Sequence, residues 1–326
     1  MKVEETGEFE LIELIKSTIG NDPNLLIGIG DDACAWQSDN AIHLATTDSL
    51  VEGIHFESSL TNWSDLGYKA LAVNLSDIAA MGGKGRLALV SMALPGRMET
   101  ENVINFYQGM LELARETGVS IGGGNISRSP VINITVAAIG TSLADGLLRR
   151  SGAATGDLIA ITGNPGSSAG GRMLLTSTPN ADRACAAPLL KAFTRPHPRL
   201  AEGQILVKKK ASSCIDISDG LLADLYHILE ASGVSATVDT DKLPIETLLE
   251  AGFSQKHAVE LCLGGGEDYE LMFTANQNAM KNIAEDFTIP VSVIGSIIDG
   301  IPGSIALTGE LAPTENINLF GWKHFG

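Results

Sequence analysis

Apolar residues recur along the first half of the chain with two different spacings. Between residues 9 and 19 they follow the period of an amphipathic helix, whereas other stretches are short and continuously apolar, as in buried strands. The pattern predicts, in chain order, a helix over 9–19, a strand over 42–45, a helix over 64–81, a strand over 87–94, a helix over 101–116 and a strand over 131–139. Ser64 and Asp65 are predicted to cap the second of these helices. This alternation predicts an α/β domain.

A second α/β series follows in the other half of the chain. It comprises strands over 158–162, 213–218, 236–238, 271–273 and 291–294, and a helix over 221–231. Between the two series, residues 146–156 contain three glycines and little apolar pattern, so we place a domain boundary there. We expect an N-terminal domain over 1–149 and a C-terminal domain over 150–326, since 326 residues exceed one ordinary core.

Glycine-rich segments are candidates for phosphate binding, because backbone N–H groups in such loops bind anions. They lie at residues 28–30, 122–125 and 264–266. No GxxxxGK[ST] segment is present, which excludes an ordinary P-loop. The glycines at 163–171 are better explained by a tight turn and close helix packing. Glycine runs alone are weak support for a nucleotide site.

Aspartates are concentrated where predicted elements end. Asp32 follows Gly-Ile-Gly, Asp48 follows two threonines at the end of a strand, and Asp216 and Asp219 follow another strand. Asp77 lies three residues after Asn74 on one helix face. Any one of these residues has a simple structural explanation; Asp219, for example, is a possible N-cap. If the carboxylates converge, each pair about 4 Å apart costs roughly 4 kcal/mol at an effective dielectric near 20, so a convergent cluster needs protons or a hard cation such as Mg²⁺.

Composition excludes several classes of protein. The 22 basic and 39 acidic side chains give a net charge of −17, which disfavours nucleic-acid binding. The acidic first residues do not fit a signal peptide, and no apolar run has the length of a membrane span. We therefore expect a cytoplasmic protein without nucleic-acid or membrane partners. The four cysteines form no zinc or disulfide spacing, and we expect them to be reduced and buried.

Seven segments of the chain, in order, resemble motifs of the thiamine-monophosphate kinase family. They read GIGDDA at 28–33, TTDSLVEGIHF at 46–56, KALAVNLSDIAAMG at 69–82, RSGA at 150–153, DISDGL at 216–221, GGEDYE at 265–270 and GWKHF at 321–325. The resemblance covers nearly the whole chain. It implies a two-domain α/β fold of the aminoimidazole ribonucleotide synthetase type, whose N-terminal sheet pairs with that of a second subunit in a homodimer.

The resemblance also implies an activity. The γ-phosphoryl group of ATP would pass to thiamine monophosphate, giving thiamine diphosphate and ADP, with several Mg²⁺ ions as cofactors. The nucleophile is a phosphate oxygen, so positioning and charge neutralisation would supply most of the catalysis and no general base is required.

The family's site residues correspond to positions in this chain. Magnesium ligands are implied at Asp32, Thr46, Thr47, Asp48, Asp77, Asn125, Asp216 and Asp219. ATP contacts are implied at Tyr107, Gly124, Asn125, Arg150 and Ser218. Thiamine contacts are implied at His55, Glu267 and Trp322, and catalytic roles at Asp48, Asp77, Arg150 and Asp216.

Two positions depart from the family pattern, and alternatives on the same fold stay open. Asn125 stands where the family often has aspartate, which removes a charge, and Gly85 stands where it often has proline. Selenophosphate synthetase would need a reactive N-terminal cysteine, and the hydrogenase-maturation relative a C-terminal one; neither is present. Aminoimidazole ribonucleotide synthetase and a non-catalytic nucleotide or thiamine diphosphate sensor are the remaining alternatives.

Overall fold

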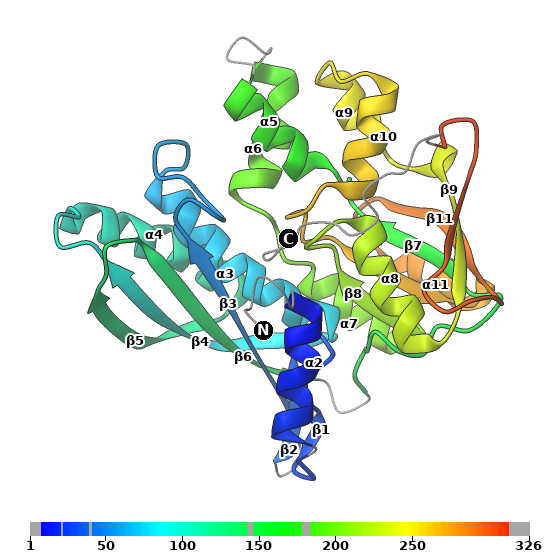
Figure 1. The fold of residues 1–326 in the computed structure, drawn as a ribbon, viewed down its shortest axis with the longest axis horizontal. Coiled ribbons are helices and arrows are strands. Elements are labelled where there is room, and N and C mark those ends of the chain that lie inside the picture. The colour runs from blue at the N-terminus through cyan, green and yellow to red at the C-terminus, as the bar shows by residue number, and fades with distance from the viewer. Residues whose placement is uncertain (1–7, 21, 39–40, 143–145, 178–182, 313–326) are drawn as a thin grey trace.

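Two six-stranded β-sheets, one in each half of the chain, organise the fold (Figure 1). The computed structural model describes residues 8–20, 22–38, 41–142, 146–177 and 183–312. Together with the packed helices, the two mixed sheets confirm the expected two-domain α/β fold class. No helix within these ranges is both long and apolar enough to cross a bilayer.

The N-terminal sheet has the strand order β1-β2-β3-β6-β4-β5. Its half of the chain contains α2 (Glu8–Ile19), β1 (Leu25–Ile27), β2 (Cys34–Ser38), β3 (Ala41–Val51), α3 (Trp63–Ala80), β4 (Gly83–Leu94), α4 (Thr100–Thr117), β5 (Ser120–Arg128) and β6 (Asn133–Ser142). Neighbouring strands are antiparallel except β4 and β5, which are parallel and joined through α4. The edge strand β5 therefore belongs to a βαβ unit.

The C-terminal sheet has the strand order β12-β9-β11-β7-β10-β8. Its strands are β7 (Leu158–Thr162), β8 (Ser213–Asp216), β9 (Ser235–Asp239), β10 (Leu271–Ala275), β11 (Val291–Ile298) and β12 (Ile305–Thr308). Its helices are α5 (Ser167–Ser177), α6 (Arg183–Thr194), α7 (Leu200–Lys209), α8 (Leu221–Ser232), η1 (Thr240–Lys242), α9 (Glu246–Glu250), α10 (Gln255–Gly264) and α11 (Gln277–Asp286). Among these strands, only β9 and β12 pair in parallel.

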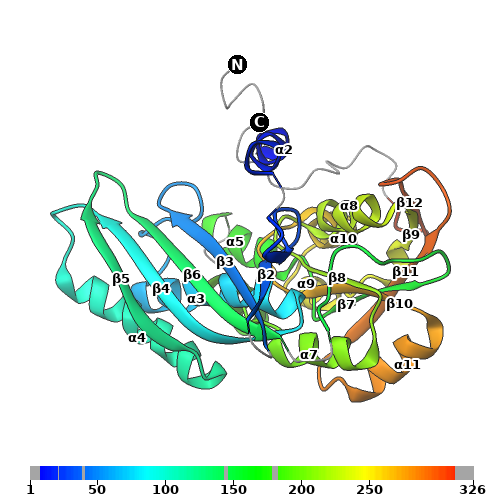
Figure 2. The ribbon, with the colours of Figure 1, turned by 90° about the horizontal axis from the view of Figure 1, so that it is seen from below.

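The two sheets are covered differently by helices. In the N-terminal domain, α3 and α4 pack on one face, while the opposite face over β6, β4 and β5 has no helix on it in the described part of the chain (Figure 2). In the C-terminal domain both faces are covered. Ile159 and Ile161 of β7 pack with α8 and α10, whereas Ala160 between them packs with α7 and α11. This alternation is the period-2 pattern of a strand buried on both sides.

Helix α3 lies between the two domains. It packs against β3, β4 and β6 of its own sheet and also contacts α7 and β8 of the other domain. Most of its residues are buried, including the polar Lys69, Asn74 and Ser76. A helix that is buried nearly all round has to satisfy such polar side chains internally. Their hydrogen-bond and ion-pair partners therefore lie on the elements packed around α3.

Most predicted elements are confirmed, but several details are wrong. Asn62, and not Ser64 or Asp65, caps α3, because its side-chain oxygen accepts from the Asp65 N–H. The glycines at 122–124 lie inside β5 rather than in a loop. Asp48 lies within β3 rather than at its end, since pairing with β6 continues to Val51.

The apolar pattern also missed some helices and strands, and the expected burial of one cysteine was wrong. The strand β12 and the helices α9, α10 and α11 were not expected from the apolar pattern. All four cysteines are free, as expected, but Cys185 is exposed rather than buried.

Candidate active site

A cleft of about 950 Å³ is lined by seven of the fifteen predicted site residues. One wall comes from the N-terminal domain, namely β3, the segment after it and α3. The other wall comes from α5, α6, α10 and the two loops at 216–219 and 264–269 of the C-terminal domain. Asp48, Asp77, Asp216, Asp219 and Glu267 line this cleft. A site between domains fits the usual location of ligand pockets.

Three of the predicted aspartates converge at one end of the cleft. One carboxylate oxygen from each of Asp32, Asp77 and Asp216 lies within 4.8 Å of the others. These residues come from the loop after β1, from α3 and from the end of β8. Segments far apart in the sequence therefore build one cluster of negative charge.

Each aspartate of the cluster has a different fixed partner. The Thr46 hydroxyl donates to Asp77 Oδ2, and the Ser76 hydroxyl donates to Asp216 Oδ2 at 2.6 Å. Asp32 Oδ1 accepts from Nε of Arg150 at 3.0 Å and also pairs with its Nη2. The bond between Ser76 and Asp216 joins α3 to β8, and the pair of Asp32 with Arg150 also connects the two halves of the chain.

Burial and mutual repulsion make these carboxylates hard to ionise. The pKa of Asp77 is raised well above its ordinary value by burial, then by the charges of Asp48 and Asp216. Burial, followed by the charge of Asp32, raises the pKa of Asp216 to about 7. Burial raises the pKa of Asp31, next to the cluster, to about 6. At neutral pH the cluster therefore has to hold protons or bind a cation.

The donor set fits a hard divalent cation. All nearby donors are oxygens, which Mg²⁺ prefers over nitrogen and sulfur. The buried Oδ2 of Asp32 has no hydrogen-bond partner among the described residues, and a buried carboxylate oxygen without a partner is costly. The Oδ2 atom of Asp32 is therefore available as a ligand for a bound cation.

Asp48 and its neighbours extend this site along β3. The backbone N–H of Asp48 donates to the side-chain oxygen of Asn74 at 3.1 Å, which ties the strand to α3. Burial raises the pKa of Asp48. Thr46 faces the cluster, but the Thr47 hydroxyl donates to the Val136 carbonyl instead. Neighbouring side chains of a strand point to opposite faces, so the Thr47 side chain points away from the aspartate cluster that Thr46 contacts.

The loop after β8 is organised by a residue that the sequence did not single out. Asp224 Oδ2 accepts from the N–H groups of Ser218, Asp219 and Gly220 at 3.0–3.2 Å. Gly220 is the N-cap of α8, so Asp219 is not the cap of this helix. Asp224 thereby leaves the side chains of Ser218 and Asp219 directed to the cleft, which both line.

Replacement of Asp224 tests this arrangement. We expect Asp224→Ala to lower the free energy of unfolding by about 3 kcal/mol, because one buried and two half-buried N–H groups lose their acceptor. Asp224→Asn keeps an acceptor oxygen in the same place, and we expect a change below about 1 kcal/mol. Urea unfolding of both variants measures the difference. Equal destabilisation by both would show that the charge, and not the acceptor oxygen, organises the loop.

The other end of the cleft combines apolar walls with His55 and Glu267. Leu50, Phe56 and Phe193 are among its lining residues. His55 Nδ1 accepts from the Val51 N–H at 3.1 Å, which fixes the ring at the start of the loop. Glu267 has a positive φ of 66° and lies near Tyr269 with a φ of 54°. Two strained non-glycine residues in one wall are typical of a functional site.

A buried aspartate explains the strain in this wall. Asp268 Oδ2 and Oδ1 accept from the N–H groups of Gly166 and Ser168, near the start of α5. The Glu267 and Tyr269 N–H groups donate to the carbonyls of Ser218 and Ile217. With Asp268 directed into the domain, its two neighbours line the cleft. The spacing Glu-Asp-Tyr-Glu in the sequence contains this alternation but not its left-handed backbone.

Three predicted nucleotide contacts lie away from the carboxylates of their own chain. Gly124 and Asn125 belong to the edge strand β5, separated from β3 by β6 and β4. Three strand spacings amount to roughly 14 Å. A Cβ on Gly124 would overlap the Val90 carbonyl, so glycine is needed for β4 and β5 to pair here. Tyr107 packs in α4 on the helical side of the sheet. Trp322 lies outside the described residues.

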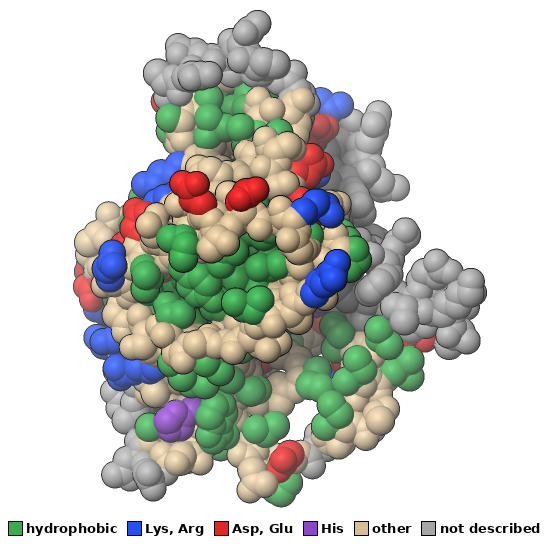
Figure 3. Space-filling view, turned by 90° about the vertical axis from the view of Figure 1, so that its left-hand side faces the viewer, with side chains coloured by type: hydrophobic (Ala, Val, Ile, Leu, Met, Phe, Trp, Pro, Cys, Tyr) green, Lys and Arg blue, Asp and Glu red, His purple; other side chains and the backbone are tan. Residues whose placement is uncertain are grey.

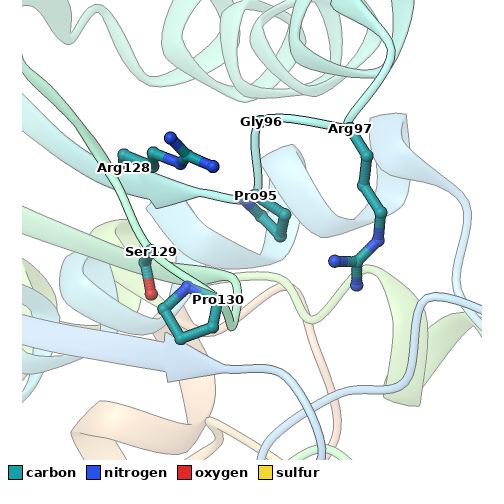
Figure 4. Close-up of a pocket in the computed structure, with 6 residues that line it drawn as sticks. All are labelled: Pro95, Gly96, Arg97, Arg128, Ser129 and Pro130. Carbon is teal, nitrogen blue, oxygen red and sulfur yellow. The ribbon is translucent and has the colours of Figure 1, made fainter.

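A second hollow lies at the far tip of the N-terminal domain (Figure 4). It has a volume of about 800 Å³ and is lined by Pro95, Gly96, Arg97, Arg128, Ser129 and Pro130. None of the predicted site residues is among those that line it. The candidate active site is therefore the cleft with the carboxylates.

Each half of the chain matches one domain of a known family. Residues 30–143 match AIR synthase related protein, N-terminal domain, and residues 154–306 match AIR synthase related protein, C-terminal domain. The boundary between the two matches falls in the same interval as the boundary between the two sheets.

Several relatives are similar over their full length. The thiamine-monophosphate kinase of Aquifex aeolicus is 33% identical over 327 residues, covering 100% of both chains. That of Escherichia coli K12 is 36% identical over 325 residues, covering 98% of each. The solved structure described as AaThiL complexed with AMPPCP and TMP has a TM-score of 0.86 at 32% identity, covering 100% of this chain and 99% of that chain. Since both its sequence and its fold match these enzymes from end to end, the chain belongs to the thiamine-monophosphate kinase family.

Proposed function

We propose that this chain transfers the γ-phosphoryl group of ATP to thiamine monophosphate, forming thiamine diphosphate and ADP with Mg²⁺. The observation that carries the proposal is the cluster of Asp32, Asp77 and Asp216 within 4.8 Å, open to a cleft of about 950 Å³. Two anionic phosphates have to meet in this reaction, and a carboxylate cluster can accept them only together with cations. The ATP analogue and the ligand TMP named for the similar structure support the choice of substrates.

The cation site is proposed to involve four carboxylates and their neighbours. Asp32, Asp48, Asp77 and Asp216 would supply the charged ligands, with further oxygens from Thr46 and Asp219 of the same copy and from Asn125 of a second copy. Bound Mg²⁺ would neutralise negative charge on the phosphates and fix their orientation. Hydrogen bonds from Thr46 and Ser76 hold Asp77 and Asp216 in place before any ligand arrives. The site is thereby preorganised.

The proposed reaction is a direct in-line attack by an oxygen of the acceptor phosphate. That oxygen is already anionic, so the chain needs no general base. Asp48, Asp77, Asp216 and Arg150 are the proposed catalytic residues, because they would fix charges around the reacting groups. The side chain of Arg150 is 25% exposed, and its guanidinium has N–H donors beyond those used by Asp32. With Ser218 it is positioned to bind nucleotide phosphate.

The thiamine end is proposed to lie at the apolar end of the cleft. Phe56 and Phe193 offer apolar surface for aromatic rings, and Glu267 offers a carboxylate to an N–H donor. His55 completes this end of the site, and Trp322 is proposed to cover the ring. The acceptor phosphate would then point along α3 toward Asp77.

A homodimer would complete the nucleotide site. The helix-free face of the N-terminal sheet exposes Leu89 at 41%, and the edge strand β5 exposes Ile126 at 67%. Figure 3 shows hydrophobic side chains gathered on the side of the molecule formed by this domain, with charged groups around them. If two copies pair through these sheets, Gly124 and Asn125 in β5 of one copy would approach the carboxylates of the other. Pairing of this kind would also remove the open edge of β5.

The domain roles follow from this proposal. Residues 1–149 would form the domain that binds ATP and Mg²⁺ and dimerises, and residues 150–326 would form the second wall of the cleft. Since ATP is the co-substrate, we place the reaction in the cytoplasm.

The test is an ADP-release assay with ATP, Mg²⁺ and thiamine monophosphate, with the product identified by mass. We expect thiamine diphosphate, formed in step with ADP and abolished by a chelator. Omission of thiamine monophosphate should leave only background release. Folded protein that binds ATP but makes no thiamine diphosphate would overturn the proposal and direct attention to aminoimidazole ribonucleotide synthesis or to a sensor.

A further inference from the structure

Lys69 is a buried cation that opens the motif at 69–82 but has no role among the predicted site residues. It lies in α3 and is 4% exposed. A lysine is rarely buried to this extent unless its ammonium group is paired. Its Nζ lies 3.0 Å from Glu267 Oε1, and this is the only ion pair of Lys69 within the described residues.

The environment of the ammonium group leaves it little freedom. The Nζ of Lys69 lies 4.4 Å from the centre of the Phe193 ring, a distance at which cation–π attraction operates. Phe193 belongs to α6 and Glu267 to the strained loop before β10, so Lys69 reaches from the N-terminal domain to two elements of the other domain. A point charge held between a carboxylate and an aromatic face fixes the position of both.

Glu267 is held at one carboxylate oxygen, and its side chain stays partly exposed. Its Oε1 takes the ion pair, while the side chain remains 29% exposed in the cleft. Its backbone N–H donates to the Ser218 carbonyl at 2.7 Å, which fixes the main chain as well. The carboxylate of Glu267 is therefore held in a fixed place on the wall of the cleft.

The spacing of residues along α3 connects the Glu267 carboxylate with the aspartate cluster. Lys69, Val73 and Asp77 are spaced by four residues and share one helix face. Val73 and Asp77 line the cleft, and Lys69 continues the same row toward Glu267. The eight residues from Lys69 to Asp77 span about 12 Å along the helix axis. A rigid, buried helix thus separates the two ends of the cleft by a constant length.

We propose that Lys69 is a positioning residue that holds Glu267 in a fixed place relative to the carboxylate cluster, so that the cleft selects acceptors whose N–H donor and phosphate can reach both groups at once. The proposal rests on the proposed kinase function and adds a determinant of acceptor recognition to it. Lys69 acts through Glu267 and does not itself contact the reacting phosphates. Its removal affects acceptor binding and not nucleotide binding.

The first measurement compares steady-state constants of wild type and Lys69→Met. We expect the KM for thiamine monophosphate to rise at least tenfold, with kcat at saturating acceptor within threefold and an unchanged KM for ATP. Lys69→Arg restores a cation and should recover part of the loss. Lys208→Met, on an exposed position of α7, is the matched control and should leave all constants unchanged. A merely structural role for Lys69 would lower the amount of active enzyme and leave the KM for thiamine monophosphate as it is.

A double-mutant cycle tests whether Lys69 acts through Glu267. Glu267→Gln alone should raise the same KM, and Lys69→Met added to it should have no further effect. The double variant buries no unpaired charge, so it remains measurable if Lys69→Met fails to fold. A Lys69→Met effect of equal size in both backgrounds, or a change in the KM for ATP, would overturn the proposal.

Binding measurements separate this proposal from the proposed function. Calorimetry with thiamine monophosphate, Mg²⁺ and a non-hydrolysable ATP analogue should give a weaker affinity for Lys69→Met than for wild type. Wild type that binds and phosphorylates the acceptor, beside a Lys69→Met variant with unchanged affinity, would overturn only the role of Lys69. Wild type that neither binds nor phosphorylates thiamine monophosphate would overturn both.

Discussion

Replacing Asp77 with asparagine is expected to lower kcat by roughly 10²–10³-fold, the range found when one electrostatic group at a transition state is removed. The amide introduced by Asp77→Asn keeps an oxygen that can accept from the Thr46 hydroxyl, so the packing of α3 is retained. What is lost is one negative charge in a cluster whose members approach within 4.8 Å. The ADP-release assay at saturating ATP and thiamine monophosphate measures the change.

The same variant is expected to be more stable than wild type in the absence of Mg²⁺. Burial and the charges of Asp48 and Asp216 raise the pKa of Asp77, so its ionisation opposes folding. Two unit charges 4.8 Å apart repel by roughly 3 kcal/mol at an effective dielectric of 20, which sets the scale of the gain. Loss of activity together with higher stability is typical of a site strained for function.

The pH dependence of this gain follows from the sign of the pKa shifts. A carboxyl group with a raised pKa in the folded state favours folding while it is protonated, and this contribution is lost as pH rises through the folded pKa. Without Mg²⁺, wild type should therefore lose stability from about pH 4 to about pH 7, the value to which burial raises the pKa of Asp216. The advantage of Asp77→Asn should grow as pH rises above about 4, the ordinary pKa of an aspartate, as measured by urea unfolding.

Asp286→Asn is the matched control, since Asp286 is a half-exposed partner of Lys209 far from the cleft. It should change neither kcat nor the stability by a measurable amount. Asp77→Asn with more than a tenth of wild-type activity would remove Asp77 from the proposed catalytic residues. Addition of Mg²⁺ at pH 8 should stabilise wild type more than Asp77→Asn.

Arg150→Met is expected to have the opposite effect on stability. It leaves the buried Asp32 carboxylate without its partner, and breaking a buried ion pair from one side costs about 3–5 kcal/mol. Burial already raises the pKa of Asp32, and Arg150 is the group that opposes this shift. Activity should fall as well, because the guanidinium is the proposed fixed positive charge at the nucleotide phosphates. Urea unfolding and the ADP-release assay measure the two effects.

A double variant distinguishes loss of the ion pair from loss of packing. Asp32→Asn with Arg150→Met removes both charges, and it should recover most of the stability lost in Arg150→Met alone. Arg86→Met is the control, because Arg86 is exposed and donates to the Thr141 hydroxyl at 2.9 Å. Its effect should be within about 0.5 kcal/mol. A double variant as unstable as Arg150→Met would assign the loss to packing of the arginine stem.

Local sequence patterns predicted most helices and strands, and they indicated that the aspartates are concentrated near the ends of these elements. The helical period of α3 placed Asn74 and Asp77 on one face, and both now tie this helix to β3, through bonds with Asp48 and Thr46. A helix or strand buried on one side repeats its apolar residues with its own period, so this information is contained in a short window. Sequence spacing alone did not predict that Asp32 and Asp216 would lie next to Asp77.

Other features had no local signal. The glycines at 122–124 are typical of a loop, yet β5 forms because its backbone pairs with β4. Asp224 looks like an ordinary polar residue in the first turn of α8, and only the folded loop brings three N–H groups to its Oδ2. Nothing in the sequence around Lys69 indicates that Glu267 is its ion-pair partner.

The sequence by itself therefore determined the order of most helices and strands, the acidic and α/β character of the chain, and the motifs that it shares with the thiamine-monophosphate kinase family. The tertiary structure decided which of those residues meet. Contacts such as Ser76 with Asp216 and Lys69 with Glu267 join segments that are distant along the chain, and they form because α3 packs between the two domains. Periodicity reports the burial of a residue on its own element, whereas the partner across an interface depends on how whole elements pack against one another.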